Sequence, residues 1–222
     1  MADTESGPRA EVTDHRVSGR RVGIIDYKAG NLQSIGNAFE HLGVQVVRVH
    51  QESDIAGCTH LVLPGVGAFG FCADRLAESG LTPTVERWAY ELRRPLLGIC
   101  VGMQLFADAS EESPDARGLG WIGGHVRRIP GVDCVVRVPH VGWNTVTFDS
   151  PCGGYRAGDE ADFYFDHSFA YQDPVRGATV ASCEHGLRFS AIVQRDNILA
   201  VQFHPEKSQA SGMRFLRGFL AV

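Results

Sequence analysis

The sequence lacks any long apolar run: no stretch of its 222 residues approaches the ~18 consecutive apolar residues of a membrane-spanning helix. The first twenty residues have no apolar centre, so they do not resemble a secretion signal. There is no excess of positive charge, because 21 Lys and Arg stand against 26 Asp and Glu, for a formal net charge of -5. These absences predict a cytoplasmic protein that binds neither membranes nor nucleic acid.

Paired metal-binding cysteines are also missing. The six cysteines form no C-x-x-C pair, and no H-x-x-x-H motif accompanies them. We therefore expect no metal site and no cofactor. The chain is long enough to form a core without cross-links and has no secretion signal, so we expect reduced thiols. The cysteines are Cys58, Cys72, Cys100, Cys134, Cys152 and Cys183.

What is present is an ordinary globular composition, with apolar residues at 44%. Residues 1–20 are polar and unpatterned, and we interpret them as a mobile extension before one domain at 21–222. Short apolar runs alternate with helical patterns in the first half of the domain. This alternation predicts an α/β fold with a mostly parallel sheet flanked by helices. Closely spaced β-like segments predict β-rich additions in the second half.

The expected elements have approximate bounds. In the first half, strands are expected at 21–26, 44–49, 59–63 and 95–99, and helices at 29–42 and 70–94, the latter broken near Pro83. In the second half, β-segments are expected near 125–129, 134–138, 143–148, 161–166, 178–183, 189–194 and 198–203, and a final helix at 209–220.

The pentapeptide Gly98-Ile-Cys-Val-Gly102 has the G-x-nucleophile-x-G pattern of a sharp strand-to-helix turn, with Cys100 at the nucleophile position. The composition of residues 103–106 indicates a helix. Cys100 would then lie at a helix N-terminus, where the dipole favours the thiolate. A buried, unreactive cysteine is the alternative, and the pentapeptide alone does not decide between the two.

The segment Gln202-Phe-His-Pro-Glu-Lys207 offers the base that a cysteine nucleophile requires. His204 ends a strand-like run, and Glu206 is near enough to turn back and orient the imidazole. A surface histidine beside a solvated glutamate is the alternative for this segment taken alone. Combined with Cys100, the segment favours a Cys-His-Glu triad.

The loop Pro64-Gly-Val-Gly67 follows an apolar strand. It lacks the Lys-Ser or Lys-Thr ending of a Walker-type loop, so it is not predicted to hold phosphate. Its backbone N–H groups are candidates for an oxyanion hole. An ordinary turn at a strand end is the alternative.

Together these motifs resemble those of class I glutamine amidotransferases, in which Cys, His and Glu hydrolyse the side-chain amide of glutamine. Six strings extend the resemblance over nearly all of residues 22–220, to the glutaminase subunits of imidazole glycerol phosphate synthase in histidine biosynthesis. The resemblance implies a class I glutamine amidotransferase-like fold with a central mixed sheet flanked by helices. The six strings are Asp26–Leu32, Pro64–Phe69, Gly118–Gly120, Pro139–Asn144, Phe163–Ser168 and His204–Gln209.

The resemblance also implies roles for matching residues. Cys100 would attack the glutamine carboxamide and form a glutamyl thioester, His204 would shuttle protons, and Glu206 would orient His204. The strand 65–67 would supply oxyanion donors. The implied glutamine-binding residues are Gly65, Gly67, Gln104, Glu112, His167, Ser168 and Phe169.

A partner is implied as well. Ammonia would pass to a separate (β/α)8-barrel cyclase subunit, forming a heterodimer that makes imidazole glycerol phosphate and the aminoimidazole carboxamide ribonucleotide. Lys207 and Tyr164 would contact this subunit, and Trp143 and Asn144 would lie on the loop lining the ammonia exit.

Some positions depart from the family pattern. Asp166 stands where an apolar residue is usual, Phe169 replaces a common Tyr, and Ala200 replaces a frequent Gly. Two other functions stay open: a glutaminase for anthranilate, guanylate or pyridoxal phosphate synthesis, and a catalytically silent module that only binds a partner. The intact set of Cys100, His204 and Glu206 argues against the silent module.

Overall fold

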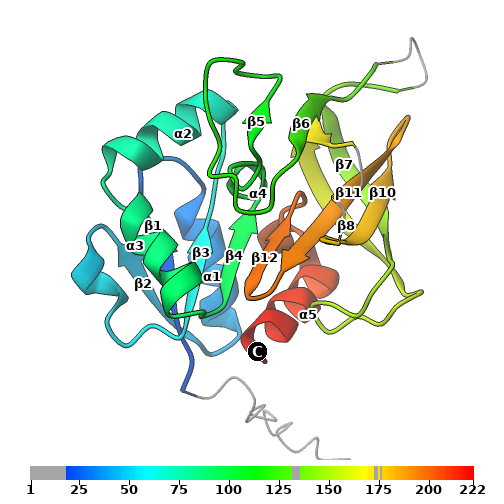
Figure 1. Cartoon of the computed structure of the whole chain (residues 1–222). Coiled ribbons are helices and arrows are strands. Elements are labelled where there is room, and N and C mark those ends of the chain that lie inside the picture. Colours follow the sequence, from blue (N-terminus) through cyan, green and yellow to red (C-terminus); the bar gives the residue numbers. More distant parts are fainter. Residues whose placement is uncertain (1–18, 132–135, 173–174, 176) are drawn as a thin grey trace, which may run out of the picture.

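The protein's computed structural model describes residues 19–131, 136–172, 175 and 177–222. Residues 1–18 of the expected extension and residues 134–135 of an expected β-segment lie outside these ranges. The main feature is a sheet of nine strands (Figure 1). They are β1 (Arg21–Ile25), β2 (Gln45–Val49), β3 (His60–Leu63), β4 (Leu96–Ile99), β7 (His140–Phe148), β8 (Glu160–His167), β10 (Thr179–Glu184), β11 (Arg188–Arg195) and β12 (Ile198–Val201).

The strand order of this sheet is β2-β1-β3-β4-β12-β11-β10-β7-β8. Pairings from β2 through β1, β3 and β4 to β12 are parallel, and the four from β12 to β8 are antiparallel. Figure 1 shows the antiparallel strands curling away on the opposite side of the molecule from β2. The sheet is mixed, as expected. It is not mostly parallel, contrary to our prediction: the second-half strands extend the same sheet, so antiparallel pairings equal the parallel ones in number.

Three shorter strands form a second sheet in the order β5-β6-β9. They are β5 (Ala109–Ser110), β6 (His125–Arg128) and β9 (Phe169–Tyr171). Only β6 corresponds to an expected segment, since two or three residues are too few to show an alternating pattern. This sheet joins the turn after β8 to the segment that follows the Cys100 region.

The helices cover the sheet and close its connections. Figure 1 shows α2 and α3 in front of the parallel strands and α1 behind them. None of the helices within the described ranges is long and apolar enough to cross a membrane. They are α1 (Leu32–His41), η1 (Glu52–Ile55), α2 (Phe69–Glu78), α3 (Thr82–Glu86), η2 (Arg87–Glu91), α4 (Val101–Gln104), η3 (Pro205–Lys207) and α5 (Gln209–Leu220).

Helix ends differ from expectation for local reasons. Helix α1 begins at Leu32, later than predicted, because the Asn31 side chain accepts a hydrogen bond from the Ser34 N–H at 3.3 Å and caps it. The expected break near Pro83 falls just before it, and Pro83 lies in the first turn of α3, where its missing N–H is tolerated. The helix predicted over 103–106 is a single turn ending at Gln104.

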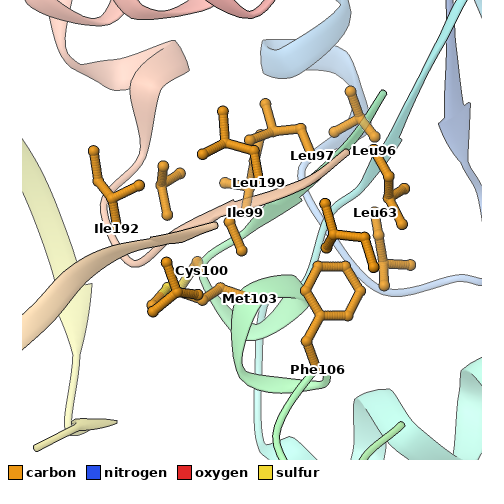
Figure 2. Packing of buried hydrophobic residues seen from close by; sticks show 14 of the residues in the cluster. Leu63, Leu96, Leu97, Ile99, Cys100, Met103, Phe106, Ile192 and Leu199 are labelled. Carbon is orange, nitrogen blue, oxygen red and sulfur yellow. The ribbon is translucent and has the colours of Figure 1, made fainter. Parts of the chain in front are cut away.

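The central strands of the large sheet position the site. Strands β3, β4 and β12 are buried at every residue, which explains why β4 and β12 are continuous apolar runs and why β3 is one after His60. Figure 2 shows Leu96, Leu97 and Ile99 of β4 among the buried side chains around Cys100. The carboxyl end of β4 therefore presents Cys100 from a rigid, fully buried support.

Candidate active site

Cys100 lies in the sharp turn between β4 and α4. Its backbone has φ +56° and ψ -113°, a strained conformation for a residue with a Cβ. Glycine is required at Gly102, because a Cβ there would lie 2.0 Å from the Leu63 carbonyl oxygen. The predicted elbow is thus present. Helix α4 has only four residues, so the dipole of a long helix does not act on the thiol.

His204 and Glu206 form the second part of the predicted triad. Nδ1 of His204 lies 2.8 Å from Oε1 of Glu206, and the side chains are 4% and 1% exposed. The His204 N–H donates to the Tyr164 carbonyl at 2.9 Å, and the Ser208 hydroxyl donates to the His204 carbonyl at 2.6 Å. The turn at Pro205 is therefore fixed on both sides of the histidine.

The charge state of His204 follows from its neighbours. Burial alone lowers the pKa of His204, but hydrogen bonds to Cys100 and Glu206 outweigh it and raise the pKa to about 10. The imidazole is therefore protonated near neutral pH, with the cysteine sulfur on one side and the carboxylate on the other. Such a histidine can give a proton to a leaving group once a covalent bond to the sulfur forms.

A cavity of about 330 Å³ opens above these residues. It brings Cys100 and His204 together with six of the seven residues predicted to hold glutamine; Gly65 is the exception. Lys207 also lines it. The predicted residues in its lining are Gly67, Gln104, Glu112, His167, Ser168 and Phe169. Asp166, noted from the sequence as a departure from the family pattern, also lines it, as do Val66, Val101 and Pro139, which were not selected.

The loop expected to supply oxyanion donors lies against the elbow. The Val101 N–H donates to the Gly65 carbonyl at 3.3 Å. Gly65 therefore turns its oxygen, and not its N–H, toward the residue that follows Cys100. Donation from this loop to a reacting oxygen stays a prediction, and the Val101 N–H becomes free only if the Gly65 carbonyl turns away.

A pair of buried glutamines connects the cavity lining to the nucleophile. Gln104 Nε2 donates to the Phe169 carbonyl and to Gln202 Oε1, both at 3.0 Å. Gln202 Nε2 lies 3.8 Å from Cys100 Sγ. Gln202 is fully buried and was not selected from the sequence. The feature that could have identified it in the sequence is its position, as an amide directly after the apolar strand β12.

Glu112 also lines the cavity, and its Oε2 accepts a hydrogen bond of 2.7 Å from the Phe69 N–H. This bond holds the carboxylate at the start of α2. We therefore expect the predicted contact with glutamine to involve Oε1 of Glu112.

The structure brings three of the four predicted partner residues together. Lys207 Nζ lies 5.5 Å from the ring centre of Tyr164, and the ring of Trp143 lies edge-on to Tyr164 at 6.3 Å. The prediction that Trp143 and Asn144 lie on a loop is wrong. Both lie within strand β7, which continues through them in register with β8. Because strand side chains alternate, Asn144 turns away, toward His140 and the Glu184 carbonyl.

Cys100 differs from the other cysteines in its surroundings. All five described cysteines are buried free thiols, and Cys134 lies outside the described residues. Burial raises the pKa of Cys72 to about 11 and those of Cys152 and Cys183 to about 12. Among the described cysteines only Cys100 lines the cavity. In the same part of the chain, no group of three His, Cys, Asp or Glu is placed to hold a metal ion.

Comparison with known proteins agrees with this geometry. Residues 23–221 match the family model described as glutamine amidotransferase class-I. The chain is 41% identical to imidazole glycerol phosphate synthase subunit HisH 2 of Nitrobacter winogradskyi, over 90% of this chain and 97% of that protein. It is 43% identical to subunit HisH of Zymomonas mobilis, over 90% and 94%.

Solved structures show the same fold at lower identity. A crystal structure of a glutamine amidotransferase matches with a TM-score of 0.70 and 21% identity, over 90% of this chain and 98% of that one. A glutamine amidotransferase of Thermotoga maritima matches with a TM-score of 0.56 and 18% identity, over 89% and 81%. The chain therefore belongs to the class I glutamine amidotransferases and, among them, to the HisH subunits of imidazole glycerol phosphate synthase.

Proposed function

We propose that the chain hydrolyses glutamine to glutamate and ammonia through Cys100, His204 and Glu206. One observation carries the proposal: Cys100 and His204 line one cavity together with Gln104 and Glu112, and His204 Nδ1 lies 2.8 Å from Oε1 of Glu206. A cysteine activated by an oriented histidine is the arrangement that acyl transfer from an amide needs.

The reaction divides into two steps. Cys100 reacts as the thiolate, its thiol proton being the one that His204 holds. Sγ attacks the carboxamide carbon, the C–N bond breaks, and His204 gives this proton to the departing ammonia, leaving a glutamyl thioester. His204 then takes a proton from water, whose oxygen attacks the thioester carbon, and the C–S bond breaks to release glutamate. Glu206 keeps the imidazole oriented and stabilises its charged form through both steps.

The negative charge on the carbonyl oxygen needs N–H donors in both steps. The candidates are the N–H of Val101, which follows Cys100, and those of the 65–67 loop, whose Gly65 contacts Val101. In the present arrangement the Gly65 carbonyl occupies the Val101 N–H. Turning of the Gly65 peptide would free the Val101 N–H and reorient the Val66 N–H, which belongs to the same peptide.

Ammonia then passes to a (β/α)8-barrel cyclase subunit, with which the chain forms a cytoplasmic heterodimer in histidine biosynthesis. The names of the relatives support this acceptor. The partly exposed cluster of Trp143, Tyr164 and Lys207 beside the cavity is the surface we assign to this contact. The products would be imidazole glycerol phosphate and the aminoimidazole carboxamide ribonucleotide.

The test is glutaminase activity of the full chain, measured with and without the cyclase and its nucleotide ligand. We expect glutamate release that rises when both are present, and none from Cys100→Ser. Activity that the cyclase leaves unchanged would assign the chain to another acceptor. Absence of glutamate under every condition would reduce it to a binding module.

A further inference from the structure

Two histidines and an asparagine form a hydrogen-bonded chain behind the cavity. The antiparallel register of β7 and β8 places His140 directly opposite His167, and Asn144 lies four residues along β7 from His140. Asn144 Nδ2 lies 3.2 Å from His140 Nε2, and His140 Nδ1 lies 3.0 Å from His167 Nε2. His167 Nδ1 lies 2.9 Å from the Phe169 carbonyl oxygen. These hydrogen bonds thus run from the half-buried Asn144 of β7 to the cavity lining.

The cavity end of this chain fixes its direction. A carbonyl oxygen only accepts, so His167 Nδ1 must carry a proton and donate to Phe169. With one proton on a neutral ring, His167 Nε2 accepts, and His140 Nδ1 is its donor. His140 Nε2 is then left as the acceptor for the Asn144 amide.

The other end imposes the same direction independently. The Asn144 amide is oriented by two backbone groups: its Nδ2 donates to the Glu184 carbonyl at 2.8 Å, and its Oδ1 accepts from the Thr145 N–H at 2.8 Å. The atom facing His140 is therefore a donor. A single assignment satisfies every nitrogen, with both imidazoles neutral and protonated on Nδ1.

The surroundings keep the rings neutral and in place. His140 is stacked between Phe165, at 4.7 Å, and His185, at 4.0 Å, and His167 packs edge-on against Phe189 at 5.2 Å. Burial, followed by the neighbouring histidines, lowers the pKa of His140 to about 3. Burial is also the main cause that lowers the pKa of His167 to about 4. A nitrogen without its partner in this aromatic enclosure is costly.

The hydrogen-bond chain ends at an acceptor that it shares with Gln104. The Phe169 carbonyl accepts from His167 and also from Gln104, whose Nε2 bonds to Gln202 beside Cys100. The position of this one carbonyl therefore sets the orientation of the Gln104 amide in the cavity. A change of protonation at Asn144's end of the chain would reach the cavity without any contact with the substrate.

We propose that Asn144, His140 and His167 are positioning residues for glutamine: their one-directional hydrogen-bond chain holds the Phe169 carbonyl, and with it Gln104, in the binding geometry. The proposal rests on the proposed glutaminase function. It gives Asn144 a different task from the ammonia exit, and it makes the donor character of its amide the essential property.

The variant Asn144→Asp tests this property, because a carboxylate accepts where the amide donates. His140 must then carry a proton on Nε2, either by changing tautomer or by becoming charged. If it changes tautomer, its bare Nδ1 forces the His167 proton onto Nε2, and the Phe169 carbonyl loses its donor. Asn37→Asp is the matched control: it makes the same chemical change on the exposed face of α1, where residue 37 already accepts from Gln33.

Two measurements decide the matter. Imidazole ¹⁵N NMR of the free wild-type chain should show His140 and His167 as neutral Nδ1–H tautomers, and Asn144→Asp should abolish this pattern. With the cyclase at saturation, Asn144→Asp should raise the KM for glutamine roughly three- to tenfold, the loss of about one buried hydrogen bond, with kcat within about twofold. Asn37→Asp should change neither.

A second pair of variants distinguishes a positioning role from a role in folding alone. His167→Asn keeps an N–H donor near the position of Nδ1, so its KM should stay closer to wild type than that of His167→Leu. Equal KM values for the two folded variants would overturn the proposal, as would Nε2–H tautomers in the wild type. If the wild type shows the expected tautomers but releases no glutamate, the proposed function fails while the hydrogen-bond chain stands.

Discussion

The Tyr27 hydroxyl donates a hydrogen bond of 2.5 Å to the Pro64 carbonyl, 37 residues along the chain. This bond joins the loop after β1 to the loop after β3, and the two are in direct contact: a Cβ on Gly30 would lie 2.9 Å from that of Pro64. Burial raises the pKa of Tyr27 well above its usual value, so the hydroxyl stays a donor. The 26–32 string of the family thus supports the loop that faces Cys100.

Tyr27→Phe should therefore affect both stability and catalysis. It leaves the Pro64 carbonyl without its donor, at an expected cost of about 1–3 kcal/mol in the free energy of unfolding. It should also lower kcat, because the 64–67 loop loses an anchor. Tyr155→Phe is the matched control, since Tyr155 donates to the Ser211 carbonyl at 3.0 Å away from the cavity. Urea unfolding and glutaminase assays that show equal kcat for both variants would contradict the link to the loop.

Cys100→Ala and Cys100→Ser should abolish glutamine hydrolysis while preserving the fold, because the change is small and no other described cysteine lines the cavity. Cys152→Ala should keep its kcat, since that thiol is buried with a pKa raised to about 12. Alkylation by a glutamine-like electrophile, followed by peptide mapping, checks the assignment. Label on a cysteine other than Cys100 would refute it.

Free ammonium salt should bypass the missing nucleophile. The acceptor chemistry belongs to the partner, so a Cys100→Ala complex with the cyclase should still form imidazole product at alkaline pH, where NH3 is abundant. Product formation is measured with ammonia and with glutamine as separate sources. Loss of both activities would mean that Cys100 also supports assembly.

Much of the fold follows from the sequence because the central strands are buried on both faces. Strands β4 and β12, and β3 after His60, are short apolar runs with no alternation, a pattern that can be recognised without knowing their neighbours. Strand β9 could not be predicted from the sequence, because its three residues form a strand only by pairing with β6. The single-turn length of α4 depends equally on packing, as the elbow is pressed against Leu63.

The site divides in the same way. Cys100, His204 and Glu206 come from two short motifs, so local spacing was enough to select them. The His140 and His167 pair depends on the register of two strands, and no local pattern fixes which residues face each other. Gln202 reaches Cys100 only because β12 pairs with β4, which the sequence pattern did not specify.

Glu206→Gln should make stability depend differently on pH. The pKa of His204, about 10 in the folded state, lies above its ordinary 6.5. Binding of this proton therefore stabilises the wild type fully below pH 6.5 and no longer above about pH 10. Removing the carboxylate lowers this pKa, so the loss of unfolding free energy should be largest at the acidic end of that window. Glu160→Gln, on the exposed end of β8, is the control. A loss that is constant across the window would contradict the assignment.

Lys207 should pair with a carboxylate of the cyclase. Its ammonium lies 5.5 Å from the Tyr164 ring centre, at the cavity edge and beside Trp143, which is 48% exposed. An exposed lysine is usually a solvated charge. Here the ammonium lies within cation–π range of Tyr164 and beside an exposed tryptophan, a residue type enriched at protein interfaces.

Lys207→Ala should then weaken assembly, because truncating one member of a desolvated interfacial pair costs ~2–5 kcal/mol. If binding persists, glutamine hydrolysis should uncouple from product formation, since the lysine also lines the cavity from which ammonia leaves. Arg217→Ala, which removes a cation from the exposed side of α5, should do neither. Titration with the cyclase, following glutamate and imidazole product together, measures both effects. Wild-type affinity combined with a wild-type ratio of product to glutamate would place Lys207 outside the coupling surface.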